Sequence, residues 1–263
     1  GGSQCISAFS ALSSPLSPKH LLLVASSAAR REHARWLQAG VAQFAHPFPG
    51  MLGERRRLRV GYLTSEFGDN SVGREITAVV AAHGRAGKSV EPHCFALGAR
   101  IQPSAEAVKW QDAASGFCTG GLVQLANVDD RQAAAAINRA GVHVVIDLNG
   151  WMPGHRAAIL ALRPAAIQVG YKNFVASMGA DFEPYLASDR VASPPEFASD
   201  YSERLVLLPG SFYATEDYSL SHPECLAHAK ELRGGLDVRA EADARLGVAR
   251  RGASGGNGRR RVV

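Results

Sequence analysis

The run Val-His-Val-Val-Ile-Asp-Leu at residues 142–148 constrains the fold of this chain more than any other segment. Most of the run is apolar and rich in β-branched residues, which is typical of a strand buried on both faces of a parallel sheet. It ends in Asn149-Gly150, a dipeptide that favours a tight turn. An Ala-rich helix is predicted before it, at residues 129–140, and another helix after it, at residues 154–162. The pattern therefore predicts a central parallel strand joined to its neighbours by helices.

Other strands and helices alternate on both sides of this run. The sequence predicts strands at residues 58–63, 90–97, 166–169, 185–187 and 205–208, and helices at residues 75–83 and 104–114. This alternation favours right-handed βαβ units and an α/β, Rossmann-like fold with a mostly parallel sheet and flanking helices. Ligands of such sheets bind at the carboxyl ends of strands. We therefore expect the site in the loops at residues 64–73 and 149–154.

The two ends of the chain differ in composition from this region. Residues 1–50 are Ala- and Ser-rich and predict a short helical segment, with a helix at residues 18–40, followed by a Pro/Gly-containing linker. Residues 58–218 form the predicted Rossmann-like lobe, and residues 219–263 predict an irregular or disordered tail rich in Gly and Arg. Because the chain begins Gly1-Gly2-Ser3 without Met, we expect a fragment, a processed chain or an incomplete gene model.

Charge and cysteine usage exclude several classes of function. The formal net charge is +5, but the five positive charges at Arg250, Arg251, Arg259, Arg260 and Arg261 account for it, so no nucleic-acid partner is predicted. No apolar run reaches the roughly 18 residues of a membrane span. The spacing of the four cysteines fits neither a zinc site nor a disulfide framework. We therefore expect no metal, and reduced, partly buried thiols in an intracellular protein.

Four segments together resemble the first half of the catalytic region of protein O-GlcNAc transferases. They are LRVGYLTSEFG at residues 58–68, GVHVVIDLNG at 141–150, ALRPAAIQV at 161–169 and YSERLVLLP at 201–209, in the order of the family. The resemblance implies the N-terminal lobe of a two-lobed GT-B glycosyltransferase. It implies transfer of N-acetylglucosamine from UDP-GlcNAc to Ser or Thr of cytoplasmic or nuclear acceptor proteins, without a cofactor. Some members transfer fucose, so the sugar stays open.

The resemblance stops before the second lobe, which in the family holds most of the uridine and pyrophosphate. We therefore expect this chain to be a partial catalytic region without transferase activity by itself. No membrane partner is implied, and a sugar nucleotide is implied where the second lobe is present.

The first candidate loop follows the strand at residues 58–63. The family carries an acid-Phe-Gly-Asn-His-Pro-Thr sequence there, whereas this chain has Glu66-Phe-Gly-Asp69-Asn70-Ser71-Val. By resemblance, Glu66 and Asn70 occupy the catalytic positions, and Asp69 and Ser71 are substrate-binding. Asn70 replaces the family's His, and an amide does not accept a proton at neutral pH. Glu66 has a plain alternative, a solvated loop carboxylate.

The second and third candidate loops supply the remaining predicted substrate-binding residues. Where the family has Asn-Gly-Tyr-Thr-Lys-Gly-Ala-Arg, this chain keeps Asn149, Gly150, Gly154 and Arg156, and a helix N-terminus after such a turn favours an anion. The plain alternative is a tight turn with a helix cap. The third loop departs from the family's Leu/Met-Gly-Tyr/Phe-Pro-Gly/Ala-Thr, and its predicted binding residues are Asn173, Phe174 and Ser177.

Three functional hypotheses follow. The first is a protein O-GlcNAc transferase, and the second is a degenerate, non-catalytic remnant that serves as a protein-binding scaffold. The third, an unrelated dinucleotide-binding Rossmann domain, is weak because no GxGxxG follows the first strand.

Overall fold

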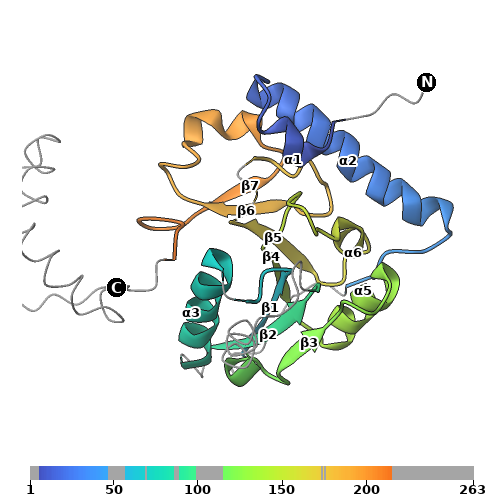
Figure 1. Ribbon diagram of the computed structural model, residues 1–263, viewed down its shortest axis with the longest axis vertical. Coiled ribbons are helices and arrows are strands. Elements are labelled where there is room, and N and C mark those ends of the chain that lie inside the picture. The colour runs from blue at the N-terminus through green and yellow to red at the C-terminus, as the bar shows by residue number, and fades with distance from the viewer. Residues whose placement is uncertain are drawn as a thin grey trace, which may run out of the picture. The chain divides into compact units, whose positions relative to one another are not determined.

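A parallel sheet is the centre of the computed structural model (Figure 1). The structure describes residues 6–46, 57–68, 70–85, 89–98, 115–172, 174 and 176–214. Within them seven strands pair in the order β3-β2-β1-β4-β5-β6-β7, and every pairing is parallel. The strands are β1 (Leu58–Thr64), β2 (Val90–Ala96), β3 (Leu122–Gln124), β4 (Val144–Asp147), β5 (Ile167–Tyr171), β6 (Tyr185–Ser188) and β7 (Arg204–Leu207). The α/β fold class is confirmed.

The helices begin at capping residues that the sequence supplies. They are α1 (Ala8–Ala11), α2 (Pro18–Gln38), α3 (Ser71–Arg85), α5 (Asp130–Arg139) and α6 (Ala157–Ala161), with the 3-10 helix η1 (Pro195–Asp200). Ser17 caps α2, and Pro18 takes the first helical position, where its missing N–H costs nothing. Asp129 and Gln132 form a capping box at the start of α5.

The two faces of the sheet are covered by different helices (Figure 1). On one face α3 packs over Tyr62, Cys94 and Ile146, and on the other α5 and α6 cover Leu63 and Val145. The neighbours Tyr62 and Leu63 belong to different clusters because successive side chains of a strand point to opposite faces. Both faces of the central strands are therefore buried, as the apolar run at residues 142–148 predicts.

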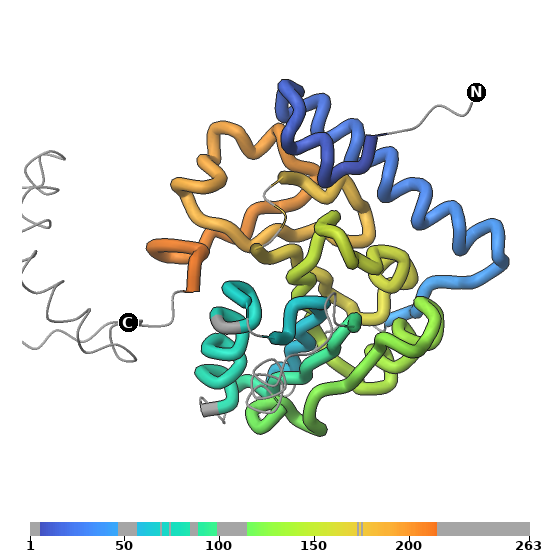
Figure 2. The backbone as a smooth tube through the Cα atoms, viewed as in Figure 1, coloured from blue at the N-terminus to red at the C-terminus, as the bar shows by residue number. Residues whose placement is uncertain are grey.

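Segments far apart in the sequence lie side by side along α2 (Figure 2). The helix packs against α6 and passes η1. Trp36 is buried at this contact, and its indole Nε1–H donates a hydrogen bond of 2.7 Å to the carbonyl oxygen of Ala158. Helix α2 is therefore part of the same folded unit as the sheet, Gly1–Glu216.

Several element boundaries differ from those predicted. Helix α6 has five residues instead of nine, because Gly154 has a φ of +87° and Arg156 has non-helical angles. Helix α3 extends further at both ends than residues 75–83, and β3 and α1 were not predicted. The predicted helix at residues 104–114 lies outside the described residues.

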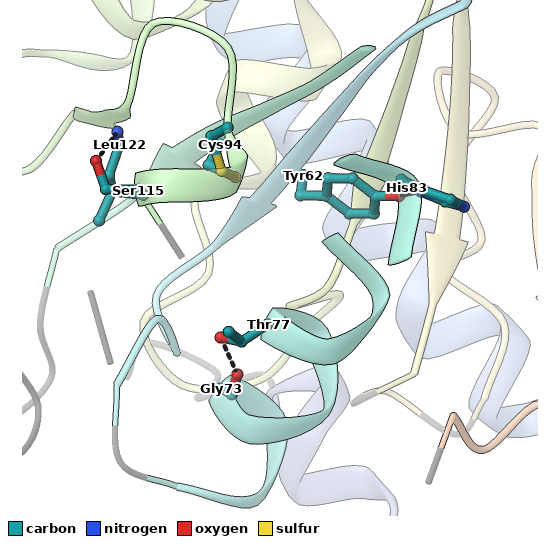
Figure 3. The surroundings of a disulfide bond; sticks show 8 residues. Tyr62, Gly73, Thr77, His83, Cys94, Ser115 and Leu122 are labelled. Atoms are coloured by element: carbon teal, nitrogen blue, oxygen red, sulfur yellow. Dashed lines mark hydrogen bonds between the residues drawn. A yellow bond between two sulfur atoms is a disulfide. The ribbon is translucent and has the colours of Figure 1, made fainter. Parts of the chain in front are cut away.

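The prediction of reduced thiols is wrong for two of the four cysteines. Cys94 on β2 and Cys118 form a disulfide, with Cα atoms 5.8 Å apart (Figure 3). The parallel register pairs Cys94 with Leu122, and a turn from Cys118 to Gly121 brings the second thiol back to the strand. This proximity depends on the pairing of β2 with β3, so the 24-residue spacing in the sequence did not reveal it.

Candidate functional site

The order of the strands selects the place where a ligand would bind. In the sheet, β1 is flanked by β2 and β4, so the connections run outward in opposite directions from the gap between β1 and β4. Open α/β sheets bind ligands in the crevice at such a switch point, at the carboxyl ends of the strands. Three loops start there: residues 65–70 after β1, 148–156 after β4 and 172–177 after β5. We call them the first, second and third loops.

Asn149 joins the first and second loops. Its side-chain Oδ1 accepts a hydrogen bond of 2.9 Å from the backbone N–H of Ser65, and its Nδ2 donates one of 2.8 Å to Ser65 Oγ. Both residues are buried. In the turn that follows, the N–H groups of Asn149 and Gly150 donate to the two carboxylate oxygens of Asp147, at 2.9 and 3.0 Å. Asn149 therefore fixes the distance between the first two loops.

The predicted catalytic residue Glu66 lies half-buried in the first loop. Its backbone N–H donates to Thr64 Oγ1 at 3.0 Å, and Ser65 Oγ donates to its Oε1 at 3.3 Å. These contacts hold the carboxylate beside the Asn149–Ser65 junction. Glu66 therefore lies at the carboxyl end of β1, beside the contact between the first and second loops.

Asn70, the second predicted catalytic residue, supports the helix that follows it. Its Oδ1 accepts a hydrogen bond of 2.7 Å from the N–H of Gly73, and its Nδ2 donates to the carbonyl oxygen of Glu66 at 3.2 Å. A Cβ on Gly73 would overlap the carbonyl oxygen of Gly68, so the helix end packs directly on the loop. Ser71 begins α3 and is exposed, whereas Asp69 lies outside the described residues. Asn70 therefore acts as the N-terminal cap of α3.

Gly150 and Phe174 bring the second and third loops into contact. Gly150 has a φ of +52°, and a Cβ there would overlap the Cβ of Phe174, whose ring is buried. Trp151 Nε1–H also donates to the carbonyl oxygen of Met178 at 2.9 Å. Only glycine satisfies both the backbone angle and the close approach at position 150. Asn173 lies outside the described residues.

Ser177 is buried, and its hydroxyl is used by the protein itself. Ser177 Oγ donates to Glu203 Oε2 at 2.7 Å and accepts the N–H groups of Gly179 and Ser202, each at 3.1 Å. Glu203 also accepts the N–H of Met178 at 2.5 Å. The third loop is therefore anchored to Glu203.

Arg156 binds the protein's own oxygens at the end of the second loop. Its Nε donates to Asp130 Oδ1 at 2.7 Å, and its two terminal nitrogens donate to the carbonyl oxygens of Leu125 and Val128 at 2.6 and 2.7 Å. The guanidinium thus ties the second loop to the start of α5. Gly154 is exposed and lies in the left-handed region.

Sequence reasoning missed Lys172, the first residue of the third loop. It has a φ of +66°, which is rare for a residue other than glycine, and its side chain is 5% exposed. Its ammonium pairs with Glu75 on α3 and lies 4.2 Å from the centre of the Tyr213 ring. Its replacement of the family's Leu or Met was visible in the sequence, but its partner on α3 was not.

Sequence reasoning also missed three buried carboxyl groups beneath the loops, Asp147, Glu183 and Glu203. Burial raises the pKa of Asp147 to about 6, while the hydrogen bonds from Asn149 and Gly150 act in the opposite direction. The charged residue inside the otherwise apolar run at residues 142–148 was the signal for Asp147. Within the described part of the chain, no three metal-ligating side chains are grouped to hold a metal ion. No described helix is long and apolar enough to cross a membrane.

The fold defines an α/β lobe with three loops at the switch point of its sheet, the edge at which open α/β sheets bind their ligands. Residues 25–235 match the family described as glycosyl transferase family 41, and this chain belongs to that family.

Two curated relatives illustrate the likeness. The first, named "Probable UDP-N-acetylglucosamine--peptide N-acetylglucosaminyltransferase SEC", from Arabidopsis thaliana, is 31% identical over 83% of this chain and 22% of its own length. The UDP-N-acetylglucosamine--peptide N-acetylglucosaminyltransferase of Caenorhabditis elegans is 31% identical over 66% of this chain and 14% of its own.

A solved structure shares the fold. A variant of the Thermobaculum terrenum O-GlcNAc transferase matches 78% of this chain and 37% of its own, with a TM-score of 0.63 and 25% identity. The chain thus spans about a fifth of the length of the first curated relative, and the expected GT-B-type lobe is confirmed.

Proposed function

We propose that this chain supplies the sheet edge of a protein O-GlcNAc transferase on which donor sugar and acceptor hydroxyl meet. The observation that carries the proposal is the junction of Asn149 with Ser65 at the switch point of the sheet, where the loops after β1 and β4 are locked together. The names of the curated relatives support UDP-GlcNAc as donor and a peptide as acceptor. In this proposal the reaction uses no metal and no organic cofactor, and takes place on cytoplasmic or nuclear proteins.

The chemistry needs an acceptor oxygen held near the anomeric carbon, a group that takes its proton, and stabilisation of the departing diphosphate. In our proposal Glu66 takes the proton, because among the described residues of the first loop it carries a carboxylate beside the Asn149–Ser65 contact. The predicted contacts of Asn149, Gly150, Gly154 and Arg156 with substrate remain part of the proposal. Gly150 would act through its backbone, and Arg156 by holding the second loop in place.

One observation favours a second candidate, a scaffold without catalysis. Asn70 stands where the family has His, and its amide caps α3. An amide cannot take a proton at neutral pH, so this position contributes no base. A lobe that keeps its loops but has lost this group could still bind a sugar nucleotide or a protein.

Thermal-shift titration of the 263-residue chain with UDP and with UDP-GlcNAc tests the proposal. Ligand at 100 times its dissociation constant stabilises a protein by about 2.7 kcal/mol. We expect UDP-GlcNAc to raise the melting temperature more than UDP, since the lobe would contact the sugar. The absence of a shift with either nucleotide would overturn the proposal for this chain.

A transfer assay on the chain joined to the second lobe of a family member, which supplies the missing half of the site, then separates the two candidates. Transfer of N-acetylglucosamine to a Ser/Thr peptide that falls about 100-fold or more in the Glu66→Gln variant supports an enzyme with Glu66 as its base. Glu196→Gln, a change on the exposed part of η1, is the matched control. Nucleotide binding without any transfer supports the scaffold.

A further inference from the structure

Glu183 is a carboxyl group for which the proposed reaction has no use. It lies two residues before β6 and its exposed fraction is 0%. Neither of its oxygens has a hydrogen-bond partner among the described residues. A buried carboxylate without donors is very unfavourable, because its charge has lost water and gained nothing in return. The arrangement therefore needs a reason.

The position of Glu183 is set by a glycine on the neighbouring strand. A Cβ on Gly170 would lie 2.6 Å from Glu183 Oε1, so the missing side chain makes room for the carboxyl group. Gly170 pairs in register with Asp147 on β4. Glu183 therefore lies beside the register pair of Gly170 and Asp147, and the Asp147 carboxylate holds the Asn149–Gly150 turn.

The charged groups that act on Glu183 are both negative. They are Asp147, from β4, and Glu203, which lies beside β7 and anchors the third loop. Helix α6, which covers this face, contributes only Ala, Ile and Leu. Lys172, at the end of β5, pairs with Glu75 on α3. Burial first, and then these two carboxylates, raise the pKa of Glu183 well above its ordinary value.

The hydrogen bonds decide which of the three groups carries the proton. Asp147 accepts two backbone N–H groups, and Glu203 accepts the N–H of Met178 and the hydroxyl of Ser177. Donors of this kind favour the anionic form of a carboxyl group. Glu183 receives none, so protonation costs it no hydrogen bond.

We propose that Glu183 is a positioning residue, held as a neutral carboxylic acid between the two carboxylates that anchor the second and third loops. Its neutral form adds no charge repulsion to Asp147 and Glu203, which keep their backbone N–H partners. Ionisation would place a further negative charge between Asp147 and Glu203, and would loosen the turn at Asn149–Gly150 and the chain at Met178, directly after the third loop. The inference rests on the proposed function only in that these loops bind substrate, and its test needs no ligand.

The experiment compares the wild-type chain with Glu183→Gln, a neutral mimic of the acid, by urea unfolding between pH 4.5 and 9. A raised folded-state pKa means that the wild type loses stability as the pH rises from the unfolded-state value through the folded-state value. We expect the two midpoints to agree near pH 4.5 and the variant to be higher at pH 9. Glu196→Gln, on exposed η1, should follow the wild type throughout.

Amide hydrogen exchange reports on the positioning itself. We expect protection of the Asn149, Gly150 and Met178 amides to fall at high pH in the wild type, after correction for intrinsic exchange, and to persist in Glu183→Gln. Glu183→Met provides a second variant if the amide disturbs folding, and should show the same pH-dependent difference from the wild type as Glu183→Gln. Parallel pH curves for wild type and variants, or unchanged protection of these amides at pH 9, would overturn the inference. Failure of nucleotide binding alone would leave it intact and reject only the proposed function.

Discussion

Ser65 and Asn149 are 84 residues apart in the chain and exchange two hydrogen bonds, of 2.9 and 2.8 Å, at the carboxyl ends of neighbouring strands. The pair closes the first loop onto the second at the switch point of the sheet. Its strength can be measured, because each partner can be removed separately.

Removal of either partner should destabilise the chain. Asn149→Ala leaves the buried N–H of Ser65 without an acceptor, and we expect it to lower the free energy of unfolding by about 2–3 kcal/mol. Ser65→Ala removes the hydroxyl's bonds to Asn149 Nδ2 and Glu66 Oε1 and should cost about 1–2 kcal/mol. Urea unfolding of both single variants and the double variant gives the coupling energy, with exposed Ser13→Ala as control. Strictly additive effects would show that the pair does not join the loops.

The Cys94–Cys118 disulfide should contribute to stability. It closes a loop with a sequence separation of 24, for which the chain-entropy treatment gives about 3.5 kcal/mol. We expect reductant to lower the unfolding midpoint of the wild type and to leave the Cys94→Ala/Cys118→Ala variant unchanged. Both thiols should resist alkylation until reductant is added. Rapid labelling of Cys94 in the native, unreduced chain would contradict this pairing.

Removal of one partner of the Lys172–Glu75 ion pair should destabilise the chain more than replacement of both partners. Lys172→Met leaves the Glu75 carboxylate without its cation and should cost about 3 kcal/mol, because a buried charge then stays unpaired. The double variant Lys172→Met/Glu75→Leu should recover most of this loss. Chemical unfolding measures the stability of both variants. Lys19→Met, at an exposed position of α2, is the control. If the double variant is as unstable as Lys172→Met, the two residues do not act as a pair.

Asp189 should make the chain less stable in acid. Its carboxylate accepts the N–H groups of Val191, Ala192 and Phe212 at 2.7, 2.8 and 2.7 Å, and these bonds lower its pKa. A lowered folded-state pKa gives stability that is present above the unfolded-state value of 3.8 and is lost as the pH falls through the folded-state value. We expect Asp189→Asn to lower the unfolding midpoint at pH 7, with the difference from wild type shrinking below about pH 4. A constant difference across this range would argue against the role of the charge.

The sequence by itself determined the fold class and the loops that carry the candidate site. An apolar, β-branched run such as residues 142–148 predicts a strand that is buried on both faces. The alternation of strands with helices then predicts a parallel sheet. Asn149-Gly150 marked its end, and the segments shared with the family identified the lobe. These signals are local in the chain, so they can be read without coordinates.

Only the tertiary structure decided what the individual side chains do. Asn70, a predicted catalytic residue, caps the helix that follows it. Arg156 bridges two loops and Cys94 meets Cys118, because the folded chain brings distant partners together. Hydrogen bonds, disulfides and the energy of a buried charge depend on distances that sequence spacing does not contain. The same holds for Ser65 and Asn149: each residue was readable in its own loop, but the bond between them exists only because β1 and β4 are neighbours in the sheet.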